Sequence, residues 1–137
     1  MRAIYSLMLW LLLPYVLFRL FWRARKQPEY LHHIGERFGF YGCKFNLPII
    51  WIHAVSVGET RATVSLVAEL ERHFPGHQLL FTHTTPTGRA IGAQLFGDRV
   101  IRVYLPYDYP FAVKKFIGFF RPRLGILMET EIWFNLI

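Results

Sequence analysis

The sequence is poor in cysteine, with Cys43 the only one among 137 residues. No disulfide can therefore form within the chain, and this scarcity fits a reducing compartment. Cysteine and histidine are not clustered at the spacing of a zinc site either. The sequence also has no internal repeat and no low-complexity tract.

The common fingerprints of nucleotide and hydrolase sites are absent as well. No G-x-G-x-x-G follows a predicted strand, and no G-x-x-x-x-G-K-[ST] phosphate loop occurs. No G-x-S-x-G turn is present, so we do not expect a hydrolase serine. A site in this chain therefore has to be built from carboxylates, hydroxyls and backbone amides.

Negative charge is scarce, with nine Asp and Glu against sixteen Lys and Arg, a formal net charge of +7. A basic chain favours an anionic partner, which can be nucleic acid, an anionic membrane surface or a phosphorylated ligand. Hydrophobic residues make up 53% and aromatic residues 18% of the chain. These fractions exclude a disordered chain, and the length predicts one modest domain.

The first 22 residues predict a helix that anchors the protein to a membrane. Residues 3–18 carry no charge, and a cationic cluster follows at once: Arg19, Arg23, Arg25 and Lys26. The uncharged run falls short of the roughly 20 residues that span a bilayer, unless Arg19 snorkels and the span reaches Trp22. Charge after the apolar run argues against a cleaved signal peptide and favours a cytoplasmic body.

Three arrangements of this N-terminal helix stay open. It can span the membrane, lie in the membrane plane, or pack as a buried amphipathic helix. Pro14 is expected to kink the helix in every case, because proline lacks a backbone donor. A basic and aromatic membrane-proximal segment is expected at 23–48.

Beyond that segment, apolar β-branched runs alternate with helical patterns over residues 49–137. Strands are expected at 49–55, 78–83, 99–105 and 123–128, and helices at 59–74, 86–96 and 110–120. This alternation predicts the α/β class: a Rossmann-like parallel sheet with helices on both faces. The sequence stops one element into a new βα unit, so we expect a fragment or a truncated domain.

The polar residues of this α/β body follow the predicted strands. Ligands bind outside the carboxyl ends of the strands in such sheets. Glycines in these turns, Gly58 and Gly88, allow close approach of a ligand to the backbone, and helix N-termini favour an anion. The side chains expected at this edge are Ser56, Glu59, Thr84, Thr85, Thr87, Asp108, Glu129 and Glu131.

Structural roles compete with functional ones at several of these positions. Ser56 and Glu59 match a capping box at a helix N-terminus. Thr85 before Pro86 is typical of an N-cap, and Glu131 suits the first turn of a helix. Glu129 is harder to explain structurally, because it follows a strand expected to be buried on both faces.

His53 and Glu36 carry weaker signals. A histidine within a strand is more often a satisfied core residue than a catalytic one. Glu36 has no clear physical interpretation beyond a loop carboxylate near the membrane.

Several motifs, in this order along nearly the whole chain, resemble the N-terminal half of the 3-deoxy-D-manno-octulosonic acid (Kdo) transferases. The combination is specific, whereas each motif alone is weak. The matching segments are "RARKQPEYLHHIGERFGFY", "WIHAVSVGET", "THTTPTGRAIGAQLFGD", "VYLPYDYP" and "METEIWFNLI".

This resemblance implies a glycosyltransferase of lipopolysaccharide synthesis at the cytoplasmic face of the inner membrane. Members transfer Kdo from CMP-Kdo to a lipid A precursor, with inversion at the anomeric centre and without a metal or other cofactor. The family fold pairs two Rossmann-like domains around a cleft. The N-terminal domain holds the acceptor, and the C-terminal donor domain is expected to be missing from this chain.

The resemblance also implies roles for particular residues. Glu59 of the S-V-G-E motif corresponds to the general base, and Glu129 to a group that assists in the transition state. The remaining residues expected to bind substrate are Ser56, Gly58, Thr85, Thr87, Gly88 and Glu131.

The expected partners are the lipid A precursor, an anionic membrane surface and the protein's own C-terminal domain, but no nucleic acid. Two alternatives remain. One is a membrane-tethered glycosyltransferase for another lipid acceptor. The other is a membrane-bound binding module without catalysis, in which the carboxylates are only caps.

Overall fold

A parallel sheet of four strands forms the centre of the structure, a computed structural model that describes residues 2–128 and 133–136. The strands follow the order β3-β2-β1-β4 across the sheet. Their bounds are Ile49–His53 (β1), Gln78–His83 (β2), Val100–Tyr104 (β3) and Leu124–Leu127 (β4). Each lies within the range expected from the sequence, and the α/β class is confirmed.

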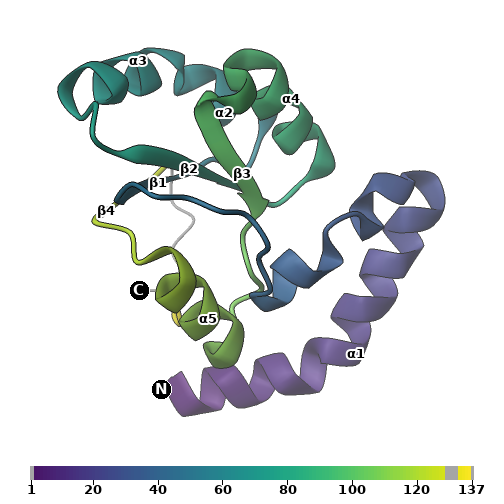
Figure 1. Ribbon diagram of the computed structural model, residues 1–137. Helices are drawn as coiled ribbons and strands as arrows, with labels where there is room; N and C mark the ends of the chain where they lie inside the picture. The colour runs from purple at the N-terminus through teal and green to yellow at the C-terminus, as the bar shows by residue number, and fades with distance from the viewer. Residues whose placement is uncertain (1, 129–132, 137) are drawn as a thin grey trace.

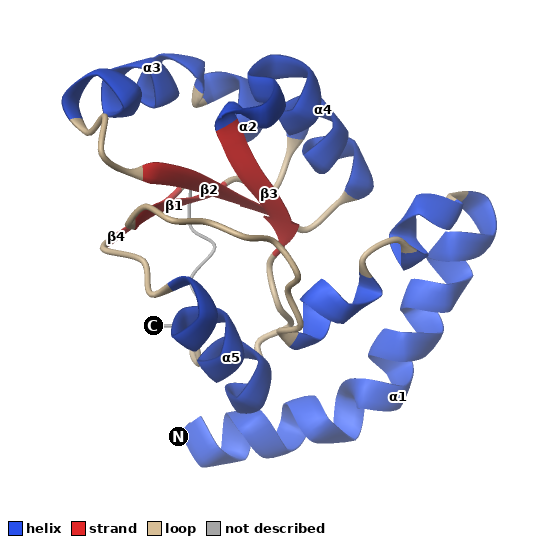
Figure 2. Ribbon diagram, in the orientation of Figure 1, coloured by secondary structure: helices blue, strands red, loops and turns tan. Residues whose placement is uncertain are grey.

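Helices cover both faces of the sheet (Figure 1). Three of them, α2 (Val57–Ala62), α3 (Val64–His73) and α4 (Pro86–Phe96), lie on one face. The helix α5 (Pro110–Phe120) lies on the other face, as Figure 2 also shows. This arrangement is the one that right-handed crossovers between parallel strands produce.

The alternating side chains of β1 divide the interior into two cores. Ile50 and Ile52 pack in the cluster that contains Val67 of α3, whereas Ile49 and Trp51 pack in the cluster that contains Phe116 of α5. All five residues of β1 are buried. This burial on both faces explains why the strand is a continuous apolar run.

The helix expected over 59–74 is in fact two helices, and that expectation was wrong in detail. The first helix begins at Val57, and a break at Thr63 separates it from α3. Thr60 Oγ1 donates to the Ser56 carbonyl over 2.8 Å, and Thr63 Oγ1 donates to the Thr60 carbonyl over 2.7 Å. Hydroxyls that bond back to the preceding turn bend helices, which the apolar periodicity alone does not reveal.

The N-terminal helix α1 (Arg2–Lys26) contains the predicted anchor segment and continues four residues beyond it. Figure 1 shows that α1 bends partway along its length, as expected from Pro14 in its interior. Its apolar side chains are largely exposed, with Leu11 at 74% and Phe18 at 63%, so the described residues do not bury this helix as the third alternative expected. By length and composition the helix could cross a membrane.

Two short 3-10 helices, η1 (Pro28–Leu31) and η2 (Ile34–Phe38), connect α1 to the sheet. Gly39 ends η2 with a φ of +82°. A Cβ at this position would lie 2.7 Å from the Ala112 carbonyl oxygen. Glycine is therefore required both by the left-handed backbone and by the close packing against α5.

Candidate functional site

A cavity of about 620 Å³ lies between α1 and the carboxyl edge of the sheet. It is lined from α1 and from the segments that follow β1, β2 and β3. The lining residues of the sheet edge include Val55, Thr84, Thr85, Leu105, Tyr107, Asp108 and Tyr109. The cavity therefore lies at the edge where the sequence predicted ligand binding, and it contains three of the predicted side chains, Thr84, Thr85 and Asp108.

Strand order defines where a ligand crevice is expected at this edge. The strands β2 and β3 follow β1 on one side, whereas the chain crosses over to place β4 on its other side. Ligands of open α/β sheets bind at such a switch point. Ser56 and Glu59 directly follow β1, at this position.

Glu59 lies half-buried in the first turn of α2. Its Oε2 accepts from the Val55 amide over 2.8 Å, and its Oε1 accepts from Ser56 Oγ over 2.8 Å. In return, the Glu59 amide donates to Ser56 Oγ over 3.2 Å. The structure thus shows a capping arrangement of the kind predicted, except that the carboxylate reaches the Val55 amide instead of that of the N-cap residue.

These capping contacts leave acceptor capacity on the carboxylate. An ionised carboxylate offers about four lone-pair sites, and the cap uses two of them. Glu59 is next to the cavity, because it accepts a hydrogen bond from the amide of Val55, and Val55 lines the cavity. A capping role and a catalytic role are therefore geometrically compatible.

The turn after β2 is organised by Thr85. Its Oγ1 accepts from the Gly88 amide over 3.2 Å and donates to the Val55 carbonyl over 3.4 Å. A Cβ at position 88 would lie 2.9 Å from the same carbonyl, so glycine permits α4 to pack against the end of β1. Thr85 is confirmed as the N-cap of α4, and the Gly88 amide is occupied by this cap.

The other residues expected to bind substrate are more exposed or are not described. Ser56, Gly58 and Thr87 are exposed, and Thr87 Oγ1 donates to Thr85 Oγ1 over 3.3 Å. Glu129 and Glu131 lie outside the described residues. The roles assigned to these five positions stay predictions.

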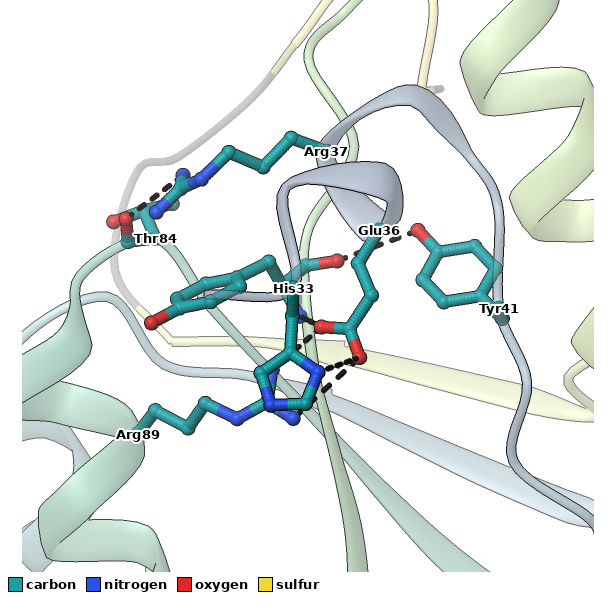
Figure 3. A network of polar contacts seen from close by, with 7 residues as sticks. His33, Glu36, Arg37, Tyr41, Thr84 and Arg89 are labelled. Carbon is teal, nitrogen blue, oxygen red and sulfur yellow. Dashed lines mark hydrogen bonds and ion pairs between the residues drawn. The ribbon is translucent and has the colours of Figure 1, made fainter. Parts of the chain in front are cut away.

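A polar network ties η2 to the sheet beside the cavity (Figure 3). Glu36 Oε2 accepts from Arg89 Nη1 over 2.5 Å and from the Tyr104 amide over 2.8 Å. His33 Nδ1 lies 3.6 Å from Glu36 Oε1. One carboxylate therefore joins η2, α4 and the end of β3.

Arg37, the next residue, is buried in the cavity wall with 4% of its surface exposed. Its Nη1 donates to the Thr84 carbonyl over 3.1 Å, as Figure 3 shows. Its guanidinium carbon lies 4.1 Å from the ring centroid of Tyr104, whose ring also has Arg89 at 4.8 Å. Such cation–π contacts offset part of the cost of burying the charge.

The strand histidines are neutral groups of the core. Burial lowers the pKa of His83 to about 4, and burial also lowers the pKa of His53. His53 Nδ1 lies 2.9 Å from Thr82 Oγ1 and His83 Nδ1 lies 3.0 Å from the Ala54 carbonyl. The core position expected for His53 is confirmed, but the ring is satisfied only at Nδ1, because the buried Nε2 has no hydrogen-bond partner among the described residues.

The sequence did not indicate the polar residues that η2 contributes. Glu36 was noted without an explanation and Arg37 was not noted. The available signal was a pair of adjacent opposite charges inside an aromatic, glycine-flanked stretch, "GERFGF". Apart from His33, which lies three residues before Glu36, the hydrogen-bond and ion-pair partners described above for these two side chains lie 47 and more residues away, so no local pattern identifies them.

Comparison with known proteins gives a consistent picture. The sequence model of the family described as 3-deoxy-D-manno-octulosonic-acid transferase (kdotransferase) matches residues 32–137. A 3-deoxy-D-manno-octulosonic acid transferase of Haemophilus influenzae is 42% identical over 138 residues, covering 99% of this chain and 32% of the relative. The protein of the same name from Bordetella pertussis is also 42% identical, covering 99% of the chain and 33% of the relative.

A more distant relative comes from a plant. A probable mitochondrial 3-deoxy-D-manno-octulosonic acid transferase of Arabidopsis thaliana is 30% identical over 126 residues, covering 90% of the chain and 28% of the relative. The chain thus spans about a third of the length of the curated relatives it matches.

Proposed function

Since the chain belongs to the Kdo transferases, glycosyltransferases of lipopolysaccharide synthesis, we propose that it forms the acceptor-binding part of an enzyme transferring Kdo from CMP-Kdo to a lipid A precursor. The observation that carries this proposal is the position of Glu59. It lies after β1, at the switch point of the sheet and beside an amphipathic cavity. The donor-binding part belongs to the remainder of the full-length enzyme.

In the proposed reaction, an acceptor hydroxyl oxygen attacks the anomeric carbon of Kdo. Glu59 takes the proton from this hydroxyl as the new carbon–oxygen bond forms. The bond from the anomeric carbon to the phosphate oxygen breaks, and CMP leaves with the electron pair. Attack opposite the leaving group inverts the centre, and the charge of Glu129 assists the transition state. We propose no metal or other cofactor.

The supporting geometry is that of a carboxylate with spare acceptor capacity at a partly exposed position. Glu59 is fixed by Val55 and Ser56, so little reorientation is needed to meet an acceptor hydroxyl. Ser56, Gly58, Thr85, Thr87, Gly88 and Glu131 would contact the substrates around it. The competing function, a binding module without catalysis, draws its support from the same capping contacts.

The proposed location is the cytoplasmic face of the inner membrane. The exposed apolar surface of α1 and the cations at its carboxyl end, Arg23, Arg25 and Lys26, suit an anionic bilayer. Membrane association is compatible with the structure, and the particular membrane and face are part of the proposal. The anionic partners are then lipids and the phosphorylated acceptor, not nucleic acid.

The direct test is a transfer assay with CMP-Kdo and lipid A precursor. The 137-residue chain alone should transfer no Kdo, because the donor-binding part is not among its residues. The full-length enzyme should transfer Kdo under the same conditions. Transfer by the chain alone, at a rate comparable to that of the full-length enzyme, would contradict the division of roles. Absence of transfer by the full-length enzyme would contradict the proposed reaction.

Deletion of the N-terminal helix tests its proposed role as a membrane anchor. Deleting residues 1–22 should move the protein from the membrane fraction to the soluble fraction, because the exposed apolar surface of α1 is lost. A suitable control is Leu95→Asp, which alters an apolar side chain of α4 that is 37% exposed and should leave the membrane fraction unchanged. Fractionation followed by a salt wash measures both. A deleted protein that still sediments with membranes after the wash would show that α1 is not the anchor.

A further inference from the structure

We propose that His83 is a positioning residue for Glu59 and acts through the peptide group that joins Ala54 to Val55. The imidazole of His83 donates to the carbonyl of this peptide group, and the carboxylate of Glu59 accepts from its amide. This inference rests on the proposed function in taking Glu59 as the base. The contacts do not depend on that role, and they can be measured without Kdo transfer.

A single peptide group lies between the two side chains. Its carbonyl oxygen, on Ala54, lies 3.0 Å from His83 Nδ1, and its amide, on Val55, donates to Glu59 Oε2 over 2.8 Å. Hydrogen bonds at the two ends of a peptide group polarise one another, so a donor at the carbonyl strengthens donation by the amide. The contact with His83 therefore fixes the peptide plane and strengthens the hydrogen bond that orients the carboxylate.

The Ala54 carbonyl determines which nitrogen of His83 carries the proton. A carbonyl oxygen only accepts hydrogen bonds, so Nδ1 is the donor and the neutral ring has its lone pair at Nε2. Nε2 is buried and has no hydrogen-bond partner within the described part of the chain. No hydrogen bond of Nε2 in that part of the chain therefore competes with the bond made by Nδ1.

The surroundings of His83 keep the ring neutral. Burial lowers its pKa to about 4, and protonation of the ring is opposed further by His53 and by the charges of Arg89 and Arg102. A cation beside a carboxylate would stabilise its ionised form and weaken it as a base. At neutral pH His83 is instead an uncharged donor, which orients the peptide group without adding charge.

Two glycines of α4 provide the space for the imidazole. A Cβ at position 92 would lie 2.8 Å from His83 Nε2, and a Cβ at position 88 would lie 3.4 Å from Nδ1. On the same strand, the ring of Phe81 stacks with the imidazole at an interplanar angle of 21°. The close approach of α4 therefore leaves the imidazole little freedom to turn away from Ala54.

The next carbonyl along the chain is held by the turn after β2. Thr85 Oγ1 donates to the Val55 carbonyl over 3.4 Å. Consecutive carbonyls, those of Ala54 and Val55, thus accept from the last residue of β2 and from the N-cap of α4. The segment that leads from β1 to Glu59 is tied to its neighbours at two points, which limits movement of the base.

A purely structural role of His83 makes a different prediction. In that role the imidazole would only hold the end of β2 against the end of β1. Its loss would then lower stability, and any effect on kcat would be the same whether or not residue 59 is a glutamate. Kinetic coupling between His83 and Glu59 therefore separates the two roles.

The first measurement is amide hydrogen exchange at Val55 in the whole chain, held in neutral detergent. His83→Leu removes the donor, so the Val55 amide should exchange about three- to tenfold faster. His83→Asn places an amide nitrogen close to the position of Nδ1 and should restore the protection. The matched control is His73→Leu, which removes a contact of 2.9 Å between imidazole and the Glu69 carbonyl on α3 and should leave Val55 unchanged.

The second measurement is kcat for Kdo transfer by the full-length enzyme. His83→Leu should lower kcat about three- to tenfold, the effect of losing one neutral hydrogen bond, with little change in KM. His83→Asn should keep most of the rate. When Glu59→Gln is already present, adding His83→Leu should change kcat by less than about twofold, because the group that His83 positions is no longer a base.

Two results would overturn the proposal. One is unchanged exchange at Val55 in a folded His83→Leu variant, and the other is an equal fall in kcat with and without Glu59→Gln. If His83→Leu does not fold, Gly92→Ala replaces it, because the added methyl group must displace the imidazole. Unchanged exchange at Val55 in that variant would equally overturn the proposal.

Failure of the proposed function would look different. A Glu59→Gln variant that keeps its rate, or a full-length enzyme that transfers no Kdo, would overturn the proposed reaction. In either case the exchange measurement still decides whether His83 holds the segment that carries Glu59.

Discussion

Replacing Glu59 by Gln in the full-length enzyme should lower kcat for Kdo transfer by roughly 10²–10⁴, the usual contribution of a general base. An amide cannot take the proton of the acceptor hydroxyl, although it keeps the size of the side chain. Acceptor binding should change little, because a base acts mainly in the transition state. The measurement is kcat alongside the thermal midpoint of the same variant.

The capping contacts indicate that this variant stays folded. The amide oxygen of the substituted side chain can accept from the Val55 amide as the Glu59 carboxylate does, and its NH₂ group can donate to Ser56 Oγ once the hydroxyl turns. The expected loss of stability is under about 1 kcal/mol, at the lower end of the effects of altered caps. A large loss of rate would therefore not be a consequence of unfolding.

Glu69→Gln provides the matched control for Glu59. Glu69 is also a helical glutamate, and it makes exposed contacts with Arg72 and His73 on α3. Its substitution should leave kcat unchanged. If Glu59→Gln behaves like this control, with a rate within a few-fold of the original enzyme, then Glu59 is a cap and not the base.

Replacing Glu36 by Gln should lower the free energy of unfolding by about 3 kcal/mol, the size of effect seen when one partner of a buried ion pair is removed. The Glu36 carboxylate is 12% exposed and its partner Arg89 is 19% exposed. The substitution leaves Arg89 without its counter-charge, while the Tyr104 amide can still donate to the oxygen of the new amide side chain. Urea denaturation of the chain in neutral detergent measures the difference.

Glu71→Gln is the control for this prediction. Its ion pair with Arg99 has a similar length, 2.9 Å, but the two side chains are 34% and 55% exposed. Exposed pairs contribute about 0–1 kcal/mol, so this variant should unfold almost like the original chain. Equal effects of the two substitutions would mean that burial of the Glu36 network does not stabilise the fold.

Glu36 also connects stability to the cavity. It holds η2 against the sheet, and the next residue along η2 is Arg37, which lines the cavity. Loss of the Glu36 contacts should loosen the position of the guanidinium. The network therefore holds a buried cation in the cavity wall.

The sequence by itself determined the α/β class and the order of its elements. The strand of Ile49–His53 is a continuous apolar run because both of its faces are buried, and such runs are recognisable without a structure. Proline at the first position and a threonine cap marked the start of α4 at Pro86. Polar turns after the strands indicated the edge at which the cavity lies, because parallel strands end at the same edge.

Local pattern was insufficient where hydroxyl groups or distant partners decide the outcome. The break at Thr63 depends on hydrogen bonds from threonine hydroxyls to the preceding turn. A threonine in a helix can form such a bond or not, so the sequence alone does not predict where a helix breaks. The capping box at Ser56 and Glu59 was visible in the sequence, but whether the carboxylate keeps free lone pairs is a question of geometry.

Only the tertiary structure decided that α1 is exposed and that Arg37 faces a cavity. An apolar helix can be buried or exposed with the same sequence, and the difference lies in what packs against it. Arg37 becomes a buried cation because η2 is held to β3 and α4 by Glu36, through contacts that span 53 and 68 residues of chain. Electrostatic environments are set by such distant neighbours, so the sequence determined the fold and the position of Glu59 after β1, and the packing determined the burial of Arg37.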